Sequence, residues 1–284
     1  MTDSSRSLHR RRLARTLRRW RANAELSIEA AAAELLCGVG TVHRMENGES
    51  AQPLRVKAAL ELYGAPAHVV AEMVEAAKRG QRRGHVRRAF AGIADALAEY
   101  FELEAEADAV HVVEGELIPG LLQTESYARA VIGGADPHVA PEDVDRLLAI
   151  RMDRQTRLAG EQPLRLEVVL GEGALHWQVG APKVQREQLR HLVAVASATP
   201  TIEIRVLPFS AGAHPALGRN FTLLSFAGHP EPEMVYVENV AVFVLTDDEA
   251  EVKRYGVSYA RVRATALSPE DSVSLIARVA DGIQ

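Results

Sequence analysis

The chain has 284 residues, of which 47% are hydrophobic and 25% charged, and this composition excludes a mostly disordered protein and suggests two globular domains. The net charge of −5 is unevenly distributed, because residues 1–90 carry 17 basic and 9 acidic side chains while the remainder is strongly acidic. A basic segment joined to an acidic one indicates that the first part binds nucleic acid.

Membrane and disulfide-stabilised classes are not expected. The chain lacks an apolar run long enough to span a bilayer, and no apolar segment follows the basic residues near its start, so we expect neither a membrane helix nor secretion. Its single cysteine, Cys37, excludes an intramolecular disulfide and a cysteine-rich zinc site. These features favour a cytoplasmic protein.

Residues 8–79 are predicted to form short helices. The apolar residues that share one face of the first helix, with arginines on the other, are Leu13, Leu17 and Trp20. Ser27 suits the N-cap of the second helix. After a loop rich in turn-forming residues, the last two helices are predicted at 54–63 and 67–79.

From residue 103 onwards, helices alternate with β-type runs. These runs are Leu164–Leu170, Thr201–Leu207, Phe221–Phe226, Met234–Asn239 and Ala241–Leu245. The sequence therefore predicts an all-α N-terminal domain followed by a larger α+β domain with a mostly antiparallel or mixed sheet. The expected boundaries are a disordered tail at 1–7, a helix-turn-helix domain at 8–79, a basic linker and connecting helix at 80–102, and the α+β domain at 103–284.

Residues 26–48, LSIEAAAAELLCGVGTVHRMENG, carry the main functional pattern. Two short helices joined by a turn of three or four residues place the second helix where it can enter a DNA major groove. The core between the helices is expected to contain Leu35, Val42 and Met45. The side chains expected to face DNA are polar, small or basic, and they are Val39, Gly40, Thr41, His43, Arg44 and Asn47, with Arg55 beyond the loop.

This segment resembles the XRE-type (Cro/repressor-like) helix-turn-helix family, and its end, HRMENG, is similar to the SRxExG signature of that family. The resemblance implies that Arg44 contacts phosphate or a base. It also implies that Glu46 pairs with an arginine of the first helix, for which Arg19 is the candidate. The chain departs from the family at four positions, which are Glu25 in place of a turn glycine, Ile28 in place of glutamine, and Gly38 and Gly40 at the start of the second helix.

Two segments of the larger half, ELIPGLLQTESYARA at 116–130 and RVLPFSAGAHPALGRNFTLLSF at 205–226, resemble the large domain behind the XRE-type module in actinobacterial WhiJ-like regulators. The resemblance implies a transcription regulator that often acts with a small acidic partner protein. Homodimerisation is inferred from the class of helix-turn-helix transcription regulators. The polar residues proposed to meet a ligand or partner are Gln123, His214 and Glu238.

Catalytic and metal-binding patterns are weak. The segment GEGALH at 171–176 has two of the three glycines of a dinucleotide fingerprint, so we interpret it as a strand end that leads into a helix. Glu167 and Glu203 alternate along strands as surface residues do. We find no P-loop, nucleophile elbow or clustered histidines. We therefore expect no catalytic residue, no metal site, no cofactor and no enzymatic activity.

Three functions follow from these features, and the leading one is a sequence-specific regulator of transcription. It would bind double-stranded DNA as a homodimer, and its C-terminal domain would sense a ligand or a small protein partner. The second is an antitoxin-like or scaffold module with a weakened helix-turn-helix, which Ile28, Gly38 and Gly40 favour and the arginine-rich first helix opposes. The third is an enzyme attached to a DNA-binding module.

Overall fold

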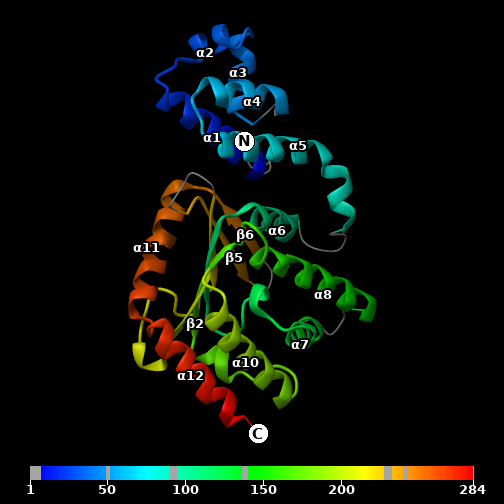
Figure 1. Cartoon of the computed structure of the whole chain (residues 1–284), viewed down its shortest axis with the longest axis vertical. Helices are drawn as coiled ribbons and strands as arrows, with labels where there is room; N and C mark the ends of the chain where they lie inside the picture. Colours follow the sequence, from blue (N-terminus) through cyan, green and yellow to red (C-terminus); the bar gives the residue numbers. More distant parts are fainter. Residues whose placement is uncertain are drawn as a thin grey trace. The chain divides into compact units, whose positions relative to one another are not determined.

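The structure is a computed structural model, and it describes residues 8–48, 52–89, 95–135, 140–226, 232–239 and 242–283 (Figure 1). The chain divides into two compact units, with the boundary between Leu103 and Glu104. Helix α6 (Asp95–Glu106) contains that boundary. In the described residues, no helix combines the length and the apolar character needed to cross a bilayer.

The first unit is helical. Its helices before α6 are α1 (Leu8–Asn23), α2 (Ile28–Glu34), α3 (Val39–Glu46), α4 (Pro53–Leu62) and α5 (Ala67–Ala89). The predicted stripe on the first helix is confirmed, because Leu13 and Leu17 are buried and Trp20 packs against the same core. Val42 and Met45 of α3 fill that core, and Leu35 packs beside them, as predicted. Apolar burial along one face of each helix therefore holds the unit together.

Helix α5 is longer than the sequence predicted. It was expected to end at residue 79 and to be followed by a basic linker, but the helical backbone continues to Ala89. Glycines at 80 and 84 suggested a break. A glycine inside a helix costs only about 1 kcal/mol relative to alanine, so it weakens a helix without ending it.

The second unit contains a six-stranded sheet with the order β3-β2-β1-β4-β5-β6. Its strands are β1 (Ala109–Glu114), β2 (Arg165–Gly171), β3 (Ile202–Leu207), β4 (Phe221–Ser225), β5 (Met234–Asn239) and β6 (Val242–Thr246). β1, β2 and β3 run parallel, whereas β4, β5 and β6 pair antiparallel with their neighbours. The expected α+β class with a mixed sheet is confirmed.

The remaining elements of the second unit are helices and single turns. They are η1 (Gly120–Leu122), α7 (Glu125–Ala135), α8 (Pro141–Gln155), η2 (Thr156–Leu158), α9 (Gly173–His176), α10 (Pro182–Ala198), η3 (Phe209–Ala211), α11 (Glu249–Thr265) and α12 (Pro269–Gly282). Helix α11 packs on one side of the sheet, and α7, α8 and α10 lie on the other (Figure 1). Ser268 caps α12 as expected, since its hydroxyl accepts the Asp271 N–H at 3.0 Å.

The sheet has two faces with different contents. On the α11 face, Val113, Phe221 and Val235 pack against Val252 and Val262. We call the other side the opposite face. Because successive side chains of a strand point to opposite sides, the residues next to Val113 and Val235 belong to the opposite face. The last residue of β1, Glu114, and the alternate residues of β5, Tyr236 and Glu238, are therefore on that face.

The GEGALH segment is a strand end that leads into a short helix, as interpreted from the sequence. β2 ends at Gly171 and α9 begins at Gly173. A Cβ atom on Gly171 would lie 2.9 Å from the carbonyl oxygen of Gly115, which is closer than real Cβ contacts allow. Close approach of two backbones therefore explains this glycine without a bound cofactor.

Candidate functional site

Helix α3 presents one buried face and one exposed face. Val42, Met45 and Glu46 are buried against the first unit, while Val39, Gly40, His43 and Arg44 are exposed and Thr41 and Asn47 are half-buried. The Asn47 amide contacts His43 Nδ1 at 3.0 Å, and Arg44 Nη2 lies 3.5 Å from the Thr41 hydroxyl. Arg55 is exposed on α4. The residues proposed to contact DNA therefore share the accessible side of α3, apart from Arg55.

Helix α3 is held by an ion pair with α1. Glu46 pairs with Arg21 rather than with Arg19, so that prediction is wrong. Arg21 Nε and Nη2 donate to the two carboxylate oxygens of Glu46 at 2.7 and 2.9 Å, and Nη1 donates to the carbonyl of Leu26 at 2.7 Å. Arg21 follows Leu17 by four residues and so continues the buried face of α1, which Arg19 does not. The hydrogen bonds to Glu46 raise the pKa of Arg21 against the effect of burial.

Two helix ends of this unit are closed by residues with positive φ that are not glycine. After α1, Glu25 has φ 55°, and after α2, Leu36 has φ 50°. At the second end, the N–H groups of Leu36 and Cys37 bond the carbonyls of Ala33 and Ala32, the arrangement that usually places glycine at this point. The side chain of Leu36 is 94% exposed. Both turns of the helix-turn-helix region therefore contain local strain.

The N-cap of α3 lacks a side chain, and that of α2 has one. The Ser27 hydroxyl accepts the Ala30 N–H at 3.1 Å, which confirms its predicted role. Gly38 occupies the equivalent position of α3 and provides no side-chain acceptor. Its backbone is extended with φ −72°, and a Cβ atom there would meet nothing within 4 Å. Gly38 is therefore not required by geometry.

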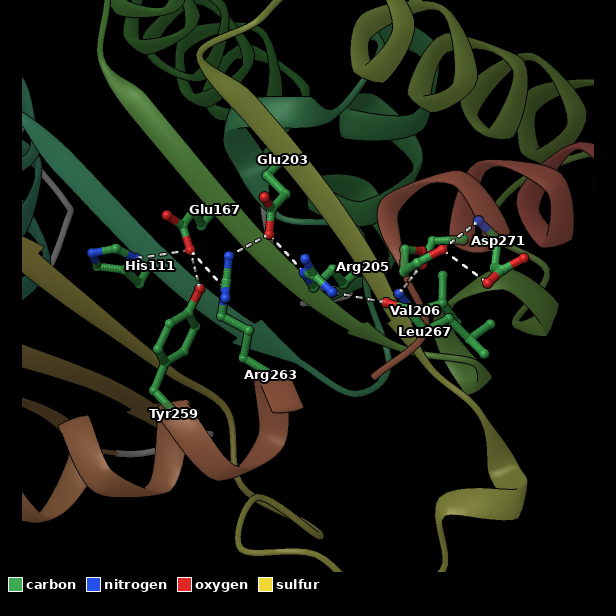
Figure 2. Close-up of polar contacts among 11 residues, drawn as sticks. His111, Glu167, Glu203, Arg205, Val206, Tyr259, Arg263, Leu267 and Asp271 are labelled. Carbon is green, nitrogen blue, oxygen red and sulfur yellow. Dashed lines mark hydrogen bonds and ion pairs between the residues drawn. The ribbon is translucent and has the colours of Figure 1, made fainter. Parts of the chain in front are cut away.

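In the second unit, polar side chains on the α11 face form a connected network (Figure 2). Glu167 on β2 accepts hydrogen bonds from Tyr259 Oη at 3.0 Å and Arg263 Nε at 3.1 Å, both from α11. Arg263 Nη2 also reaches Glu203 on β3 at 2.9 Å. The sequence suggested surface positions for Glu167 and Glu203, but they join α11 to two strands. Their partners follow in the chain after both strands, so alternation within a strand could not reveal them.

His111 and Arg205 complete this network. His111 lies opposite Glu167 in the β1–β2 register, and its Nδ1 is 3.7 Å from the nearer carboxylate oxygen, while its ring packs on Tyr259 with centroids 5.0 Å apart. Arg205 Nε donates to Glu203 at 2.6 Å. Contacts with His111, Tyr259 and Arg263 lower the pKa of Glu167 to about 2. The network therefore stabilises an ionised carboxylate.

On the opposite face, the structure places two of the three proposed ligand residues in one region. Gln123 is 3% exposed, and its amide donates to the Ile118 carbonyl at 2.7 Å and accepts from Arg151 Nη1 at 2.7 Å. Glu238 is exposed and accepts from the Tyr236 hydroxyl at 3.0 Å. Arg151 bonds Gln123, and the Glu238 carboxylate opposes the lowering of the pKa of Arg151 by burial.

The third proposed ligand residue, His214, lies in the loop between η3 and β4. It is half-buried, and its Nδ1 has no hydrogen-bond partner among the described residues. In the part of the chain that the structure describes, no contact joins His214 to Gln123 or Glu238. The structure therefore does not bring the three proposed residues together.

Comparisons with protein families agree with the division of the chain into two units. Residues 12–73, which contain α2 and α3, match the model of a helix-turn-helix domain. Residues 97–278 match a second model, described as "Domain of unknown function (DUF5753)", and this match covers more than half of the chain. The protein belongs to the DUF5753 family. A comparison with curated proteins and one with solved structures each gave no match.

The helix-turn-helix match indicates a DNA-binding protein. The DUF5753 match covers the whole sheet and both of its polar regions, the network around Glu167 and the region around Arg151. No group of three or more residues able to hold a metal ion occurs among the described residues of the chain. Arg151 was not selected from the sequence, because α8 contains several other charged residues at helical spacing and none of them differs visibly from Arg151.

Proposed function

We propose that the protein is a sequence-specific, DNA-binding regulator of transcription whose DUF5753 domain senses a ligand or a small protein partner. The observation that supports DNA binding most directly is the exposed face of α3, where His43 and Arg44 are accessible while Val42 and Met45 anchor the helix. The net positive charge of residues 1–90 supplies the general attraction to phosphate.

The ion pair between Arg21 and Glu46 supports the same proposal. It fixes the last turn of α3 to α1. The hydrogen bond from Arg21 to the Leu26 carbonyl also holds the turn before α2 in place. A recognition helix held in this way loses little conformational freedom when it enters a groove. As a homodimer, the protein would read two half-sites about 34 Å apart. A ligand or a small acidic partner would act by favouring one dimer geometry.

An antitoxin-like or scaffold role is the second candidate, and the N-cap of α3 is the observation that favours it. Gly38 leaves the recognition helix without a side-chain cap, whereas Ser27 caps α2. Glycine in place of serine at an N-cap costs a helix only a few tenths of a kcal/mol, which would weaken recognition slightly. In either role, we propose that the protein acts by binding and not by catalysis.

Binding to DNA tests the leading proposal. Fluorescence anisotropy would compare the protein on its own upstream DNA and on random duplex across a salt series. We expect selective binding and a steep loss of affinity with salt. Replacing Arg44 by alanine should cost about 1–3 kcal/mol on the specific site if Arg44 contacts a base. A phosphate contact would instead weaken both duplexes equally and reduce the salt slope by about one.

A matched control removes an exposed positive charge elsewhere in the same unit. Lys78 lies on α5 and pairs with Glu75 at 2.6 Å. Lys78→Ala removes the same charge as Arg44→Ala but leaves α3 unchanged, so we expect a much smaller effect. Equal losses for the two variants would contradict the role of Arg44. Absence of selective binding at low salt would contradict the regulator and favour the scaffold.

A further inference from the structure

Two arginines one turn apart on α8 have different surroundings. Arg154 donates to both carboxylate oxygens of Glu104 at 2.7 Å, and the two side chains are only 14% and 3% exposed. Arg151 is also partly buried, but it bonds the neutral amide of Gln123, and no carboxylate of the described residues lies within ion-pair distance of it. Burial and the nearby Arg154 lower the pKa of Arg151 to about 10. Arg151 is therefore a poorly solvated cation without a counter-ion from the described chain.

The turn around η1 holds Arg151 in place. Gln155 donates from its amide to the carbonyls of Gly120 and Gln123 at 2.9 and 2.7 Å, and Gln123 is itself bonded to Ile118. A Cβ atom on Gly120 would lie 3.6 Å from both Arg151 Nε and Arg154 Nη1. The guanidinium of Arg151 thus lies against a turn whose backbone is fixed by side-chain hydrogen bonds, so its position is set before any ligand binds.

Two carboxylates occupy the same face of the sheet. Glu114 ends β1 and Glu238 lies near the end of β5, and β4 runs between these two strands. Continuing the register of β4 with its two neighbours places Glu114 and Glu238 level with Asn220, one on each side of it. Gln123, which bonds Arg151, also bonds the carbonyl of Ile118, four residues after Glu114. Burial, followed by Glu238 and Glu116, raises the pKa of Glu114 to about 8. The carboxyl of Glu114 is therefore largely protonated at neutral pH, and no basic side chain of the described residues forms an ion pair with it.

We propose that Arg151, Gln123, Glu114 and Glu238 form the binding site of the DUF5753 domain for a small amino-carboxylate. The carboxylate of the ligand would meet Arg151, and its ammonium group would meet Glu114 and Glu238. This proposal rests on the proposed sensing function. A planar guanidinium fits a carboxylate at two points, and an ammonium is the donor that two carboxylates require. A ligand with only one of these groups leaves the other charge of the site unpaired, which is costly in a poorly solvated place.

Binding of an ammonium group has a consequence for protons. A cation beside Glu114 favours the ionised carboxylate, so the protein should release a proton when the ligand binds near pH 7. The charged groups that act on Glu114 are Glu238 on β5 and Glu116 after β1, and the charge of Glu114 would itself act on Tyr127 of α7. On the same side of the sheet, the Tyr236 hydroxyl bonds Glu238, and the charge of Glu238 acts on Arg151 of α8. Tyr236 and Tyr127 have raised pKa values through burial, so they remain neutral in this range. Glu114 is therefore the group that loses the proton.

The test uses the full chain and a homologous series of probes. Thermal unfolding would be followed with glycine, β-alanine and γ-aminobutyrate, in which the distance between carboxylate and ammonium increases. Acetate and ethylammonium, each at the same ionic strength, supply one group at a time. We expect at least one amino-carboxylate to raise the melting temperature by more than acetate and ethylammonium together. Calorimetry in buffers of different ionisation enthalpy should show release of about one proton per ligand near pH 7.

Variants connect the effect to the site. Arg151→Gln should abolish the stabilisation by the amino-carboxylate. The matched control is Arg146→Gln on the same helix, because Arg146 pairs with Asp143 at 2.8 Å, and this variant should respond like the unchanged protein. Glu114→Gln keeps nearly the same side-chain volume and should eliminate the proton release. An unchanged response in Arg151→Gln, or acetate alone matching every amino-carboxylate, would overturn the proposal.

The measurements contain no DNA, so they separate this proposal from the proposed function. If the protein binds its upstream DNA selectively but responds to no probe, the regulator proposal is supported and the amino-carboxylate site is contradicted. If the protein responds to a probe through Arg151 but binds no DNA, the amino-carboxylate site is supported and the regulator proposal is contradicted.

Discussion

Two glutamates on neighbouring strands of one sheet are shifted in opposite directions. Glu167 on β2 belongs to the α11 face, where Tyr259 and Arg263 donate to it and its pKa falls to about 2. Glu114 on β1 belongs to the opposite face, where burial and two other carboxylates raise its pKa to about 8. The residue type and the secondary structure are the same. What differs is how far the carboxylate is buried and whether the protein itself supplies the opposite charge.

This difference separates charges that stabilise the fold from charges that are available to bind. The network around Glu167 connects α11 with β1, β2 and β3, so each charge has a partner from the chain (Figure 2). On the opposite face, Arg154 is paired in this way with Glu104, whereas Arg151 and Glu114 have no ion-pair partner in the part of the chain that the structure describes. Buried charges are expensive unless they are paired, and the unpaired ones are therefore candidates for function.

The largest effect is expected from breaking the ion pair between Glu104 and Arg154 on the opposite face. Glu104→Ala leaves Arg154 buried without its carboxylate and should lower the free energy of unfolding by about 3–5 kcal/mol. Arg151→Gln should leave stability unchanged or slightly higher. Urea unfolding followed by circular dichroism measures both variants. The control is Glu125→Ala on α7, whose glutamate side chain is 69% exposed. Similar losses for Glu104→Ala and Arg151→Gln would remove the distinction between the two arginines.

A smaller effect that depends on pH is expected from Glu114→Gln. The folded protein keeps a proton on Glu114 that the unfolded chain releases above its usual pKa of 4.5, so the stability of the unchanged protein should fall as pH rises from 4.5 through 8. The variant lacks this loss and should therefore be the more stable of the two proteins at pH 9, with little difference at pH 4.5. Chemical unfolding at both pH values measures this. A difference independent of pH would contradict the raised pKa.

The smallest effect is expected on the α11 face, from Arg263→Gln. The side chain of Arg263 is 40% exposed, so its pairs with Glu167 and Glu203 should contribute only about 1 kcal/mol at neutral pH. Because the pKa of Glu167 is lowered, its contribution is present above 4.5 and disappears as pH falls through 2. A double-mutant cycle with Glu167→Gln isolates the pair. A coupling as large at pH 2 as at pH 7 would show that charge is not its source.

The sequence predicted local structure better than long-range contacts. Helical spacing placed Leu13 and Leu17 in the core, and β-type composition located the strands from β2 to β6, because both patterns lie within a few residues. The predicted partner of Glu46 was wrong because Arg19 and Arg21 lie two residues apart on α1 and differ only in the side of the helix that they occupy. The role of Glu167 was missed because its partners lie on α11, and nothing in β2 indicates which helix covers it.

The sequence identified individual residues of the two candidate sites but not the long-range contacts that connect them. The exposed face of α3 follows from one helix and its buried residues, so His43 and Arg44 could be selected from the sequence. Gln123 and Glu238 were selected as separate residues. Their connection through Arg151 depends on how the turn at η1, helix α8 and strand β5 come together, which is a property of the tertiary structure.

The position of β1 in the sheet has a consequence for how the protein folds. β1 lies between β2 and β4, and its first residue, Ala109, pairs with Arg165 on one side and with Ser225 on the other. During synthesis, β1 leaves the ribosome long before β4 exists, whereas the helices of the first unit need only nearby partners. Contacts that are distant in sequence form slowly, so β1 should remain exposed on one edge while the helix-turn-helix unit is already folded.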